Sequence, residues 1–338
     1  MLQQYTVSRD DSIYEAFPDL VQTATGELIC VFLECEHHSI RKKVRIVMTK
    51  STDNGRTWSP KMGFTEICKE GHTYNCPRIS RLPDNSLVVL CDCNGVSEQH
   101  LWRSFDNGQT WKGPEIFPFH GIVPDKYQVL SNGRHIFAIH DENEKGKLEQ
   151  YAYYSDDSGK TWTKTIVASD ERYNLCEASI LEVQPGILIA FMRENSFLGY
   201  CCKKTISYDF GTTWSSVYDT NIDCCHRPVA GFYEKDKILL TYRYMQGGKG
   251  WLGSWTQNLF GAFFDVETAL ATERSQQSVR IFPIAFDRSP QSDTAYSGWV
   301  RQKNGEFYVV NYLLDDAPKA QIRGYSFSLD DVILPEIK

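Results

Sequence analysis

Ser51-Thr-Asp53-Asn-Gly55-Arg-Thr57-Trp58 is the stretch that decides the fold, because its pattern is not alone. The pattern Ser-x-Asp-x-Gly-x-Thr-Trp begins again at Ser104, at Ser155 and at Ser207, so the starts lie 53, 51 and 52 residues apart. A regular period of this length predicts an array of repeated supersecondary units. Within each copy, Asp accepts hydrogen bonds from nearby amides, Gly supplies a positive φ, and Trp is an apolar anchor. We therefore interpret the four copies, called boxed turns below, as structural.

Six hairpin-like segments support the same period, each with an apolar run, a polar turn and a second apolar run. The second runs are Leu28 to Phe32, Leu87 to Leu90, Ile136 to Ile139, Ile187 to Met192, Ile238 to Tyr242 and Phe307 to Asn311. Together they predict an all-β fold, a six-bladed β-propeller with one domain over residues 1–338. We expect a decayed fifth boxed turn at Phe264-Asp265-Val266-Glu267 and a short helix within Val266 to Ser275. A strand from one terminus should close the sixth blade, because a ring must remove its open edges.

Composition and charge narrow the possible partners. Apolar residues make up 41% of the chain and aromatic residues 13%, which suits a strand-rich globule. The net charge of −7 and the pI near 5.7 give no reason to expect nucleic acid or an anionic membrane as partner. No signal peptide or membrane span is visible, and the eleven cysteines lack metal-knuckle spacing. We predict reduced thiols, no cofactor and a cytoplasmic location, or a secreted one if a leader has been removed; the oligomeric state stays open.

The hairpins also predict where a binding site lies. In each hairpin the entry of the first strand and the exit of the second share one end, opposite the turn, and in a propeller these ends surround a central mouth. The residues at these ends are Tyr14 to Asp19 with Glu34 to His38, Asn75 to Arg78 with Asp92 to Asn94, Asp125-Lys126 with His140 to Asn143, Glu177 with Arg193 to Asn195, His226-Arg227 with Arg243-Tyr244, and Tyr296 with Tyr312. Such a cluster of Arg, carboxylate and Tyr suits an acidic or polyhydroxyl ligand.

The boxed turns resemble those of the sialidase (neuraminidase) superfamily of Asp-box propellers, over nearly the whole chain. Cys176-Glu177-Ala-Ser, with Arg193 sixteen residues after the Glu, resembles the segment with the catalytic Glu and one arginine of the carboxylate-binding triad. Ala295-Tyr296-Ser297 resembles the segment with the Tyr nucleophile. The resemblance implies an exo-glycoside hydrolase acting on a terminal sugar, in which Glu177 takes the phenol proton and Tyr296 attacks the anomeric carbon. A phenol with a pKa near ~10 needs such a base.

The sequence departs from the family pattern at three places. Ala16 stands where the family has an Arg before its Ile-Pro, and the loop Glu34 to Ile40, expected to hold the Asp acid/base, contains no Asp. The third triad arginine is expected near Thr256 to Asn258, where none occurs. Glu36 or Asp92 is our candidate for the acid. The candidates for orienting the substrate are Arg193, Arg227, Arg243, His226, Asp19 and Arg78.

Two other functions stay open because of these departures. One is a non-catalytic glycan-binding propeller, and the other is a polysaccharide lyase that uses Tyr or His to abstract a proton beside a uronate. Trp251 and Trp255 could form a loop that stacks on sugar faces. His37-His38, His140 and His226 raise the question of a metal, but their spacing gives no support, so we predict no metal site.

Overall fold

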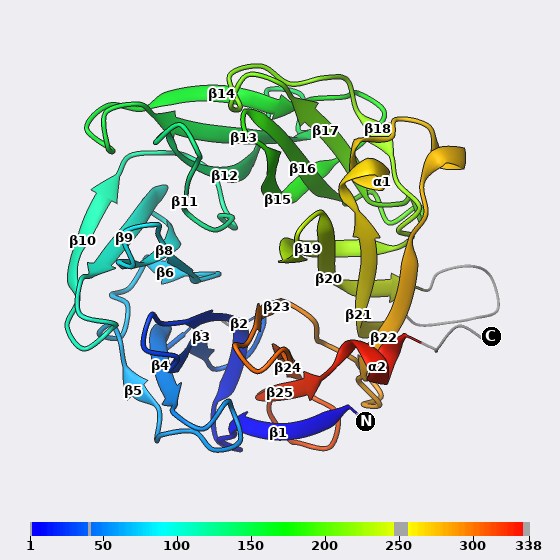
Figure 1. The fold of residues 1–338 in the computed structure, drawn as a ribbon. Helices are drawn as coiled ribbons and strands as arrows, with labels where there is room; N and C mark the ends of the chain where they lie inside the picture. The colour runs from blue at the N-terminus through cyan, green and yellow to red at the C-terminus, as the bar shows by residue number, and fades with distance from the viewer. Residues whose placement is uncertain (1, 40–41, 247–255, 334–338) are drawn as a thin grey trace.

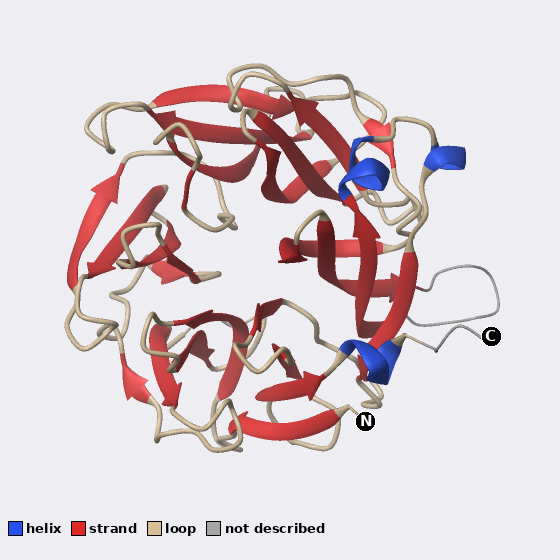
Figure 2. Ribbon diagram, viewed as in Figure 1, coloured by secondary structure: helices blue, strands red, loops and turns tan. Residues whose placement is uncertain are grey.

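The chain folds as a ring of six antiparallel sheets around a central axis (Figure 1). This architecture comes from a computed structural model, which describes residues 2–39, 42–246 and 256–333. Within the described residues strands dominate and the helices are short (Figure 2). The predicted all-β six-bladed propeller is confirmed, and each predicted apolar second run forms the buried second strand of a blade.

The blades follow one another along the chain. The first blade contains β2 (Tyr14–Gln22), β3 (Leu28–Cys35), β4 (Arg45–Ser51) and β5 (Met62–Gly63). The second contains β6 (Thr73–Tyr74), β7 (Arg78–Arg81), β8 (Leu87–Asn94), β9 (Glu98–Ser104) and β10 (Lys112–Phe117). The third contains β11 (Gln128–Val129), β12 (His135–Glu142), β13 (Leu148–Ser155) and β14 (Thr163–Ala168).

The second half of the ring repeats this order. The fourth blade contains β15 (Leu175–Gln184), β16 (Ile187–Glu194), β17 (Lys203–Ser207) and β18 (Tyr218–Asp219). The fifth contains β19 (Cys225–Glu234), β20 (Lys237–Gln246), β21 (Thr256–Asp265) and β22 (Arg280–Phe286). The sixth contains β23 (Ser297–Arg301), β24 (Phe307–Leu313), β25 (Gln321–Phe327) and β1 (Gln3–Ser8).

The ring is closed by its two ends, as the sequence predicts. The N-terminal strand β1 pairs antiparallel with β25, with Gln4 opposite Tyr325, so blue lies beside red in Figure 1. This pairing makes β1 the outer strand of the sixth blade. Closure by non-local strand pairing leaves the first and last blades in contact through β2 and β23.

In the fifth blade, a helix begins where the sequence predicts a decayed boxed turn. Asp265 caps the helix α1 (Val266–Leu270), and its carboxylate accepts a hydrogen bond from the Thr268 amide at 2.9 Å. The helix is shorter than predicted, since a separate 3₁₀ turn, η2 (Arg274–Gln276), follows. The helix α2 (Leu329–Val332) lies after the last strand. No described helix is long and apolar enough to cross a bilayer.

The boxed turns are stabilised by their own atoms. Ser51 Oγ accepts the Gly55 amide at 2.9 Å, and the Asp53 carboxylate accepts the amide and hydroxyl of Thr57 at 2.9 and 2.6 Å. The same serine, aspartate and threonine contacts recur in the other three copies. A Cβ on Gly55 would lie 2.1 Å from the Tyr308 ring, which adds a packing reason for glycine. The turns thus supply structure, as predicted.

The cysteines form no disulfide, and six of them lie in strands. All eleven are free, and ten of them are buried. Cys30 and Cys91, in the buried strands β3 and β8, have pKa values raised well above the ordinary value by burial. They pack as small apolar side chains.

Candidate functional site

Four residues near the axis share a backbone conformation that no sequence motif indicates. Phe17, Val123, Glu177 and Arg227 all have a positive φ, between 50° and 56°. At three of them the pairing register with the second strand shifts, which marks a β-bulge. Non-glycine residues rarely adopt this conformation, and bulges redirect side chains. The bulges help to place Phe17 and Glu177 in the wall of one cavity, which Val123 also lines.

This cavity has a volume of about 330 Å³ and lies at the predicted end of the hairpins, opposite their turns. Its lining residues are Phe17, His38, Asn75, Cys76, Ile122, Val123, His140, Glu142, Leu148, Cys176, Glu177, Arg193, Asn195 and Tyr296. A larger cavity of about 640 Å³ lies at the turn end, where Pro83, Phe232 and Arg301 line it. We place the site in the smaller cavity, because it holds a phenol, a carboxylate and a guanidinium in contact.

Glu177, Arg193 and Tyr296 form the centre of the site. The Tyr296 hydroxyl donates a hydrogen bond to Glu177 Oε1, and Nη1 of Arg193 lies 3.0 Å from both carboxylate oxygens. The same Nη1 lies 3.4 Å from the Tyr296 hydroxyl, and Nη2 donates to Asn195 Oδ1. These residues come from β15, β16 and the approach to β23, and 119 positions separate Glu177 from Tyr296. The structure brings the three together.

The electrostatics keep Glu177 ionised and Tyr296 protonated. Burial alone raises the pKa of Glu177, but the charges of Arg193 and Arg227 outweigh it and hold the pKa below its ordinary value. Burial, with the neighbouring Glu177 charge, raises the pKa of Tyr296 well above the ordinary value. The contact is therefore a carboxylate that accepts a hydrogen bond from a neutral phenol.

The buried histidines at the site are neutral. His140 Nδ1 accepts the Glu177 amide at 3.3 Å, and burial lowers the pKa of His140 to about 4. Burial, followed by the charges of Arg193 and Arg243, lowers the pKa of His226 to about 2. His226 does not line the cavity but packs edge-on against the Phe197 ring. Within the described ranges, no group of three or more His, Cys, Asp or Glu could hold a metal ion.

Arg227 and Arg243 lie behind Tyr296 and not in the cavity wall. The guanidinium carbon of Arg243 is 4.6 Å from the centre of the Tyr296 ring, and that of Arg227 is 5.8 Å away. Arg243 donates to the Thr294 carbonyl at 2.6 Å and to the Tyr312 hydroxyl at 2.8 Å, while Arg227 donates to the Pro124 carbonyl at 2.9 Å. Both side chains are buried and pack near the Tyr296 ring, whereas the sequence predicts that they contact the substrate directly.

Asp19 and Arg78, predicted to bind substrate, instead connect the inner strands. Asp19 Oδ2 accepts the Ile79 amide at 2.9 Å, and its Oδ1 lies 3.3 Å from Lys126 Nζ. Arg78 lies 3.4 Å from Asp19 and donates to the Ser297 carbonyl at 3.2 Å. Neither lines the cavity, because both are buried among strands of the first, second and sixth blades.

The two predicted acids also lie away from the cavity. Glu36 faces Lys43, with 3.4 Å between its Oε1 and the ammonium, and it does not line the cavity. Asp92 is fully buried and accepts hydrogen bonds from Asn75 Nδ2 at 3.2 Å and the Cys76 amide at 3.3 Å. It therefore supports two cavity-lining residues from behind. Neither carboxylate is positioned to protonate a bound glycoside.

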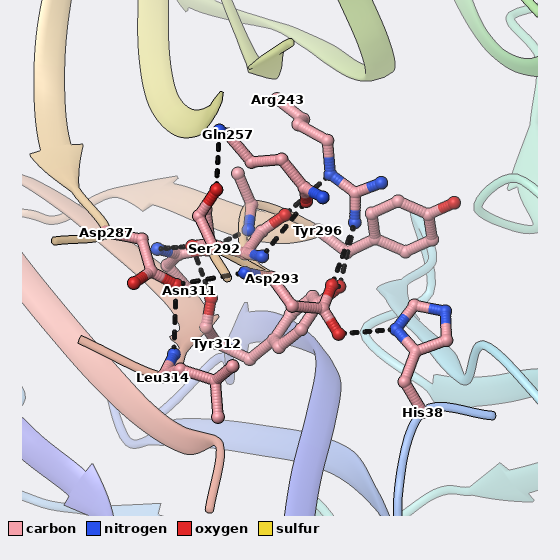
Figure 3. A network of polar contacts seen from close by, with 12 residues as sticks. His38, Arg243, Gln257, Asp287, Ser292, Asp293, Tyr296, Asn311, Tyr312 and Leu314 are labelled. Atoms are coloured by element: carbon pink, nitrogen blue, oxygen red, sulfur yellow. Dashed lines mark hydrogen bonds and ion pairs between the residues drawn. The ribbon is translucent and has the colours of Figure 1, made fainter. Parts of the chain in front are cut away.

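Sequence reasoning missed the pairing of His38 with Asp293. His38 Nδ1 lies 2.6 Å from Asp293 Oδ2, and Figure 3 shows Asp293 between His38 and Arg243. The sequence signals were the His37-His38 pair in the loop expected to hold the acid and an Asp three residues before Tyr296. Trp251 and Trp255, proposed for sugar stacking, lie outside the described residues.

With this geometry established, comparison with known proteins identifies the family. The model of the BNR repeat-like domain matches residues 41–309. The chain belongs to the BNR repeat-like domain family. A sialidase from Bacteroides fragilis is 25% identical over 244 residues, which cover 61% of this chain and 44% of that protein. The match thus spans less than half of the length of that sialidase.

Solved structures of other proteins share the fold. A protein of unknown function from Dyadobacter fermentans matches with a TM-score of 0.79 and 20% identity, covering 96% of this chain and 98% of that one. The NanB sialidase from Streptococcus pneumoniae matches with a TM-score of 0.71 and 13% identity, covering 97% of this chain and 70% of that one. At such low sequence identity these similarities show only that the fold is shared.

Proposed function

We propose that this BNR propeller is an exo-glycoside hydrolase that releases a terminal sugar from a glycan. The observation that carries the proposal is the buried contact of Tyr296 with Glu177 inside a cavity that also presents Arg193. The volume of about 330 Å³ lies at the low end of ligand sites and fits one sugar ring better than a chain threaded through the site.

In the proposed reaction Tyr296 attacks the anomeric carbon while Glu177 takes the phenol proton. Arg193 Nη1 lies 3.0 Å from the Glu177 carboxylate and 3.4 Å from the Tyr296 oxygen, so it positions the two groups relative to each other. Arg243, stacked on the Tyr296 ring at 4.6 Å, adds a positive charge that stabilises the phenolate as it forms. Water then releases the sugar, and the phenolate recovers its proton from Glu177.

Turnover of a glycoside panel tests this proposal. The wild-type protein is incubated with aryl glycosides of neutral sugars, uronides and sialosides, and the released aglycone is measured. We expect release from at least one substrate, and a loss of roughly 10²–10⁴-fold in Tyr296→Phe, because the phenyl ring cannot attack. Tyr208→Phe is the matched control, since Tyr208 is exposed within a boxed turn and should retain wild-type rates.

The outcome also separates the alternatives. A wild-type protein that is inert on every substrate contradicts the hydrolase. Glycan binding that survives Glu177→Gln and Tyr296→Phe would then favour a binding module. Ultraviolet absorbance from an unsaturated product on uronate polymers would favour a lyase.

A further inference from the structure

The hydrolase proposed above needs a proton donor for the departing alcohol, and neither Glu36 nor Asp92 reaches the cavity. Resting on that proposed function, we propose that His38 is the general acid and base and that Asp293 orients it. The pair joins the loop after β3 to the loop before β23, so it is formed only when the first and sixth blades meet.

The position of His38 suits the role of general acid and base. His38 lines the same cavity as Tyr296 and Glu177. The rings of His38 and Tyr296 both pack against Phe17, with centroids 5.4 and 5.2 Å from its ring, so the two are neighbours across one side chain. The His38 side chain is 39% exposed, which leaves it open to the cavity and to water. With Nδ1 directed at Asp293, Nε2 is the nitrogen that remains for a bound glycoside.

Asp293 is held firmly enough to orient an imidazole. Its Oδ1 accepts the Tyr312 hydroxyl at 2.8 Å and lies 3.8 Å from Arg243, and its Oδ2 also accepts the Tyr14 hydroxyl. Burial raises the pKa of Asp293, but the His38 hydrogen bond and the Arg243 charge outweigh this and lower it, so the carboxylate stays ionised.

The backbone that carries Asp293 is fixed as well. The Asp293 amide donates to Asp287 Oδ2 at 3.1 Å, and the same oxygen accepts the Leu314 amide at 3.1 Å (Figure 3). Asn311 Oδ1 accepts the Ala295 amide at 2.8 Å, between Asp293 and Tyr296. The loop is therefore tied to β24 through Asn311 and to Leu314, the residue after that strand, and one short segment positions both Asp293 and Tyr296.

The reaction balances with these groups and one water. In the first step the Tyr296 oxygen forms a bond to the anomeric carbon, and the phenol proton passes to Glu177. The bond to the departing oxygen breaks, and that oxygen keeps the electron pair and takes a proton from His38 Nε2. In the second step neutral His38 takes a proton from water, the resulting hydroxide equivalent attacks the anomeric carbon, and Tyr296 leaves and regains its proton from Glu177.

The other titratable groups of the cavity wall are less suited. His140 has its Nδ1 committed to the Glu177 amide, and its pKa of about 4 makes it a poor proton carrier near neutral pH. Burial, with the charge of Glu177, raises the pKa of the Cys176 thiol. Glu142 is an exposed carboxylate that lines the cavity, and it is the main alternative to His38 as general acid.

Leaving-group dependence tests the assignment with a readout that a structural role would not move. The kcat/KM of His38→Gln is compared with wild type on a dinitrophenyl glycoside, whose leaving group needs no proton, and on a phenyl glycoside of the same sugar, whose leaving group needs one. We expect a loss of roughly 10²–10⁴-fold on the phenyl glycoside and less than about tenfold on the dinitrophenyl glycoside. Asp293→Asn should show the same preference, with a smaller loss. His37→Gln is the matched control and should behave as wild type, while Glu142→Gln tests the competing carboxylate and should show no preference between the two substrates.

Each outcome decides between named roles. Equal losses of His38→Gln on both substrates, or none, overturn the assignment while the hydrolase stands. A selective loss in Glu142→Gln instead transfers the acid role to Glu142. A wild-type protein that releases neither aglycone overturns the proposed function, and the assignment of His38 falls with it.

Discussion

The boxed turns at one end of the blades and the bulged inner strands at the other are both repeats, but they repeat different things. The boxed turns repeat residues: the same serine, aspartate, glycine and threonine make the same contacts in four blades. The bulges repeat only backbone geometry, with a positive φ at Phe17, Glu177 and Arg227. No two of these three side chains are alike.

The difference follows from where each repeat finds its partners. The serine, aspartate and threonine of a boxed turn bond to one another and to amides within the same eight residues, so every copy needs the same residues. A bulge takes its partners from other blades: Glu177 meets Tyr296, and Arg227 meets the Pro124 carbonyl. The bulge can therefore carry a different side chain in each blade. In this propeller the repeated residues of the boxed turns stabilise the scaffold, and the residue at the bulge differs from blade to blade.

The largest effect on stability is expected at a bulge. Glu177→Ala removes the carboxylate that pairs with the buried Arg193 and lies near Arg227. We expect the free energy of unfolding in urea to fall by about 3 kcal/mol, because an unpaired guanidinium is left in a desolvated site. Glu177→Gln should lose less stability, since its amide oxygen can still accept the Arg193 hydrogen bond. A Glu177→Ala protein as stable as wild type would show that the ion pair is solvated and that the bulge is ordinary surface.

A smaller effect is expected at a boxed turn. Ser207→Ala leaves the Gly211 amide without its 2.8 Å acceptor and removes the hydrogen bond to Asp209. Urea unfolding should show a loss of about 1–2 kcal/mol, the cost of an unsatisfied buried donor. The kcat/KM on the best substrate of the panel should stay at the wild-type value. A selective loss of activity at unchanged stability would contradict the division between scaffold and site.

Sequence reasoning reached the fold and the centre of the site for the same reason: both are encoded locally. The boxed turns fixed the period, and the hairpin ends predicted that Glu177, Arg193 and Tyr296 share one cavity, as they do. Asp19 and Arg78 have the polar character of ligand-binding residues. Their actual partners, Ile79 and Ser297, belong to neighbouring blades, and only the assembled ring shows this.

The proposed acid shows the limit of local reasoning most clearly. Glu36 has the charge that the role needs, but its loop directs it to Lys43. His38 lies two residues later and gains its partner, Asp293, from 255 positions away. No pattern in either loop encodes that distance, because it is set by how β1 closes the ring and draws the sixth blade against the first.

The most direct test of the central claim, that Glu177 at a bulge of β15 and Tyr296 beside β23 act as base and nucleophile in one cavity, is to trap the sugar on the protein. The protein is incubated with a fluorinated, activated form of the sugar that it accepts, and the modified peptide is identified by mass spectrometry. The account predicts one added sugar, on Tyr296, and none in Tyr296→Phe. A label on any other residue, or on Tyr296→Phe as readily as on wild type, would contradict it.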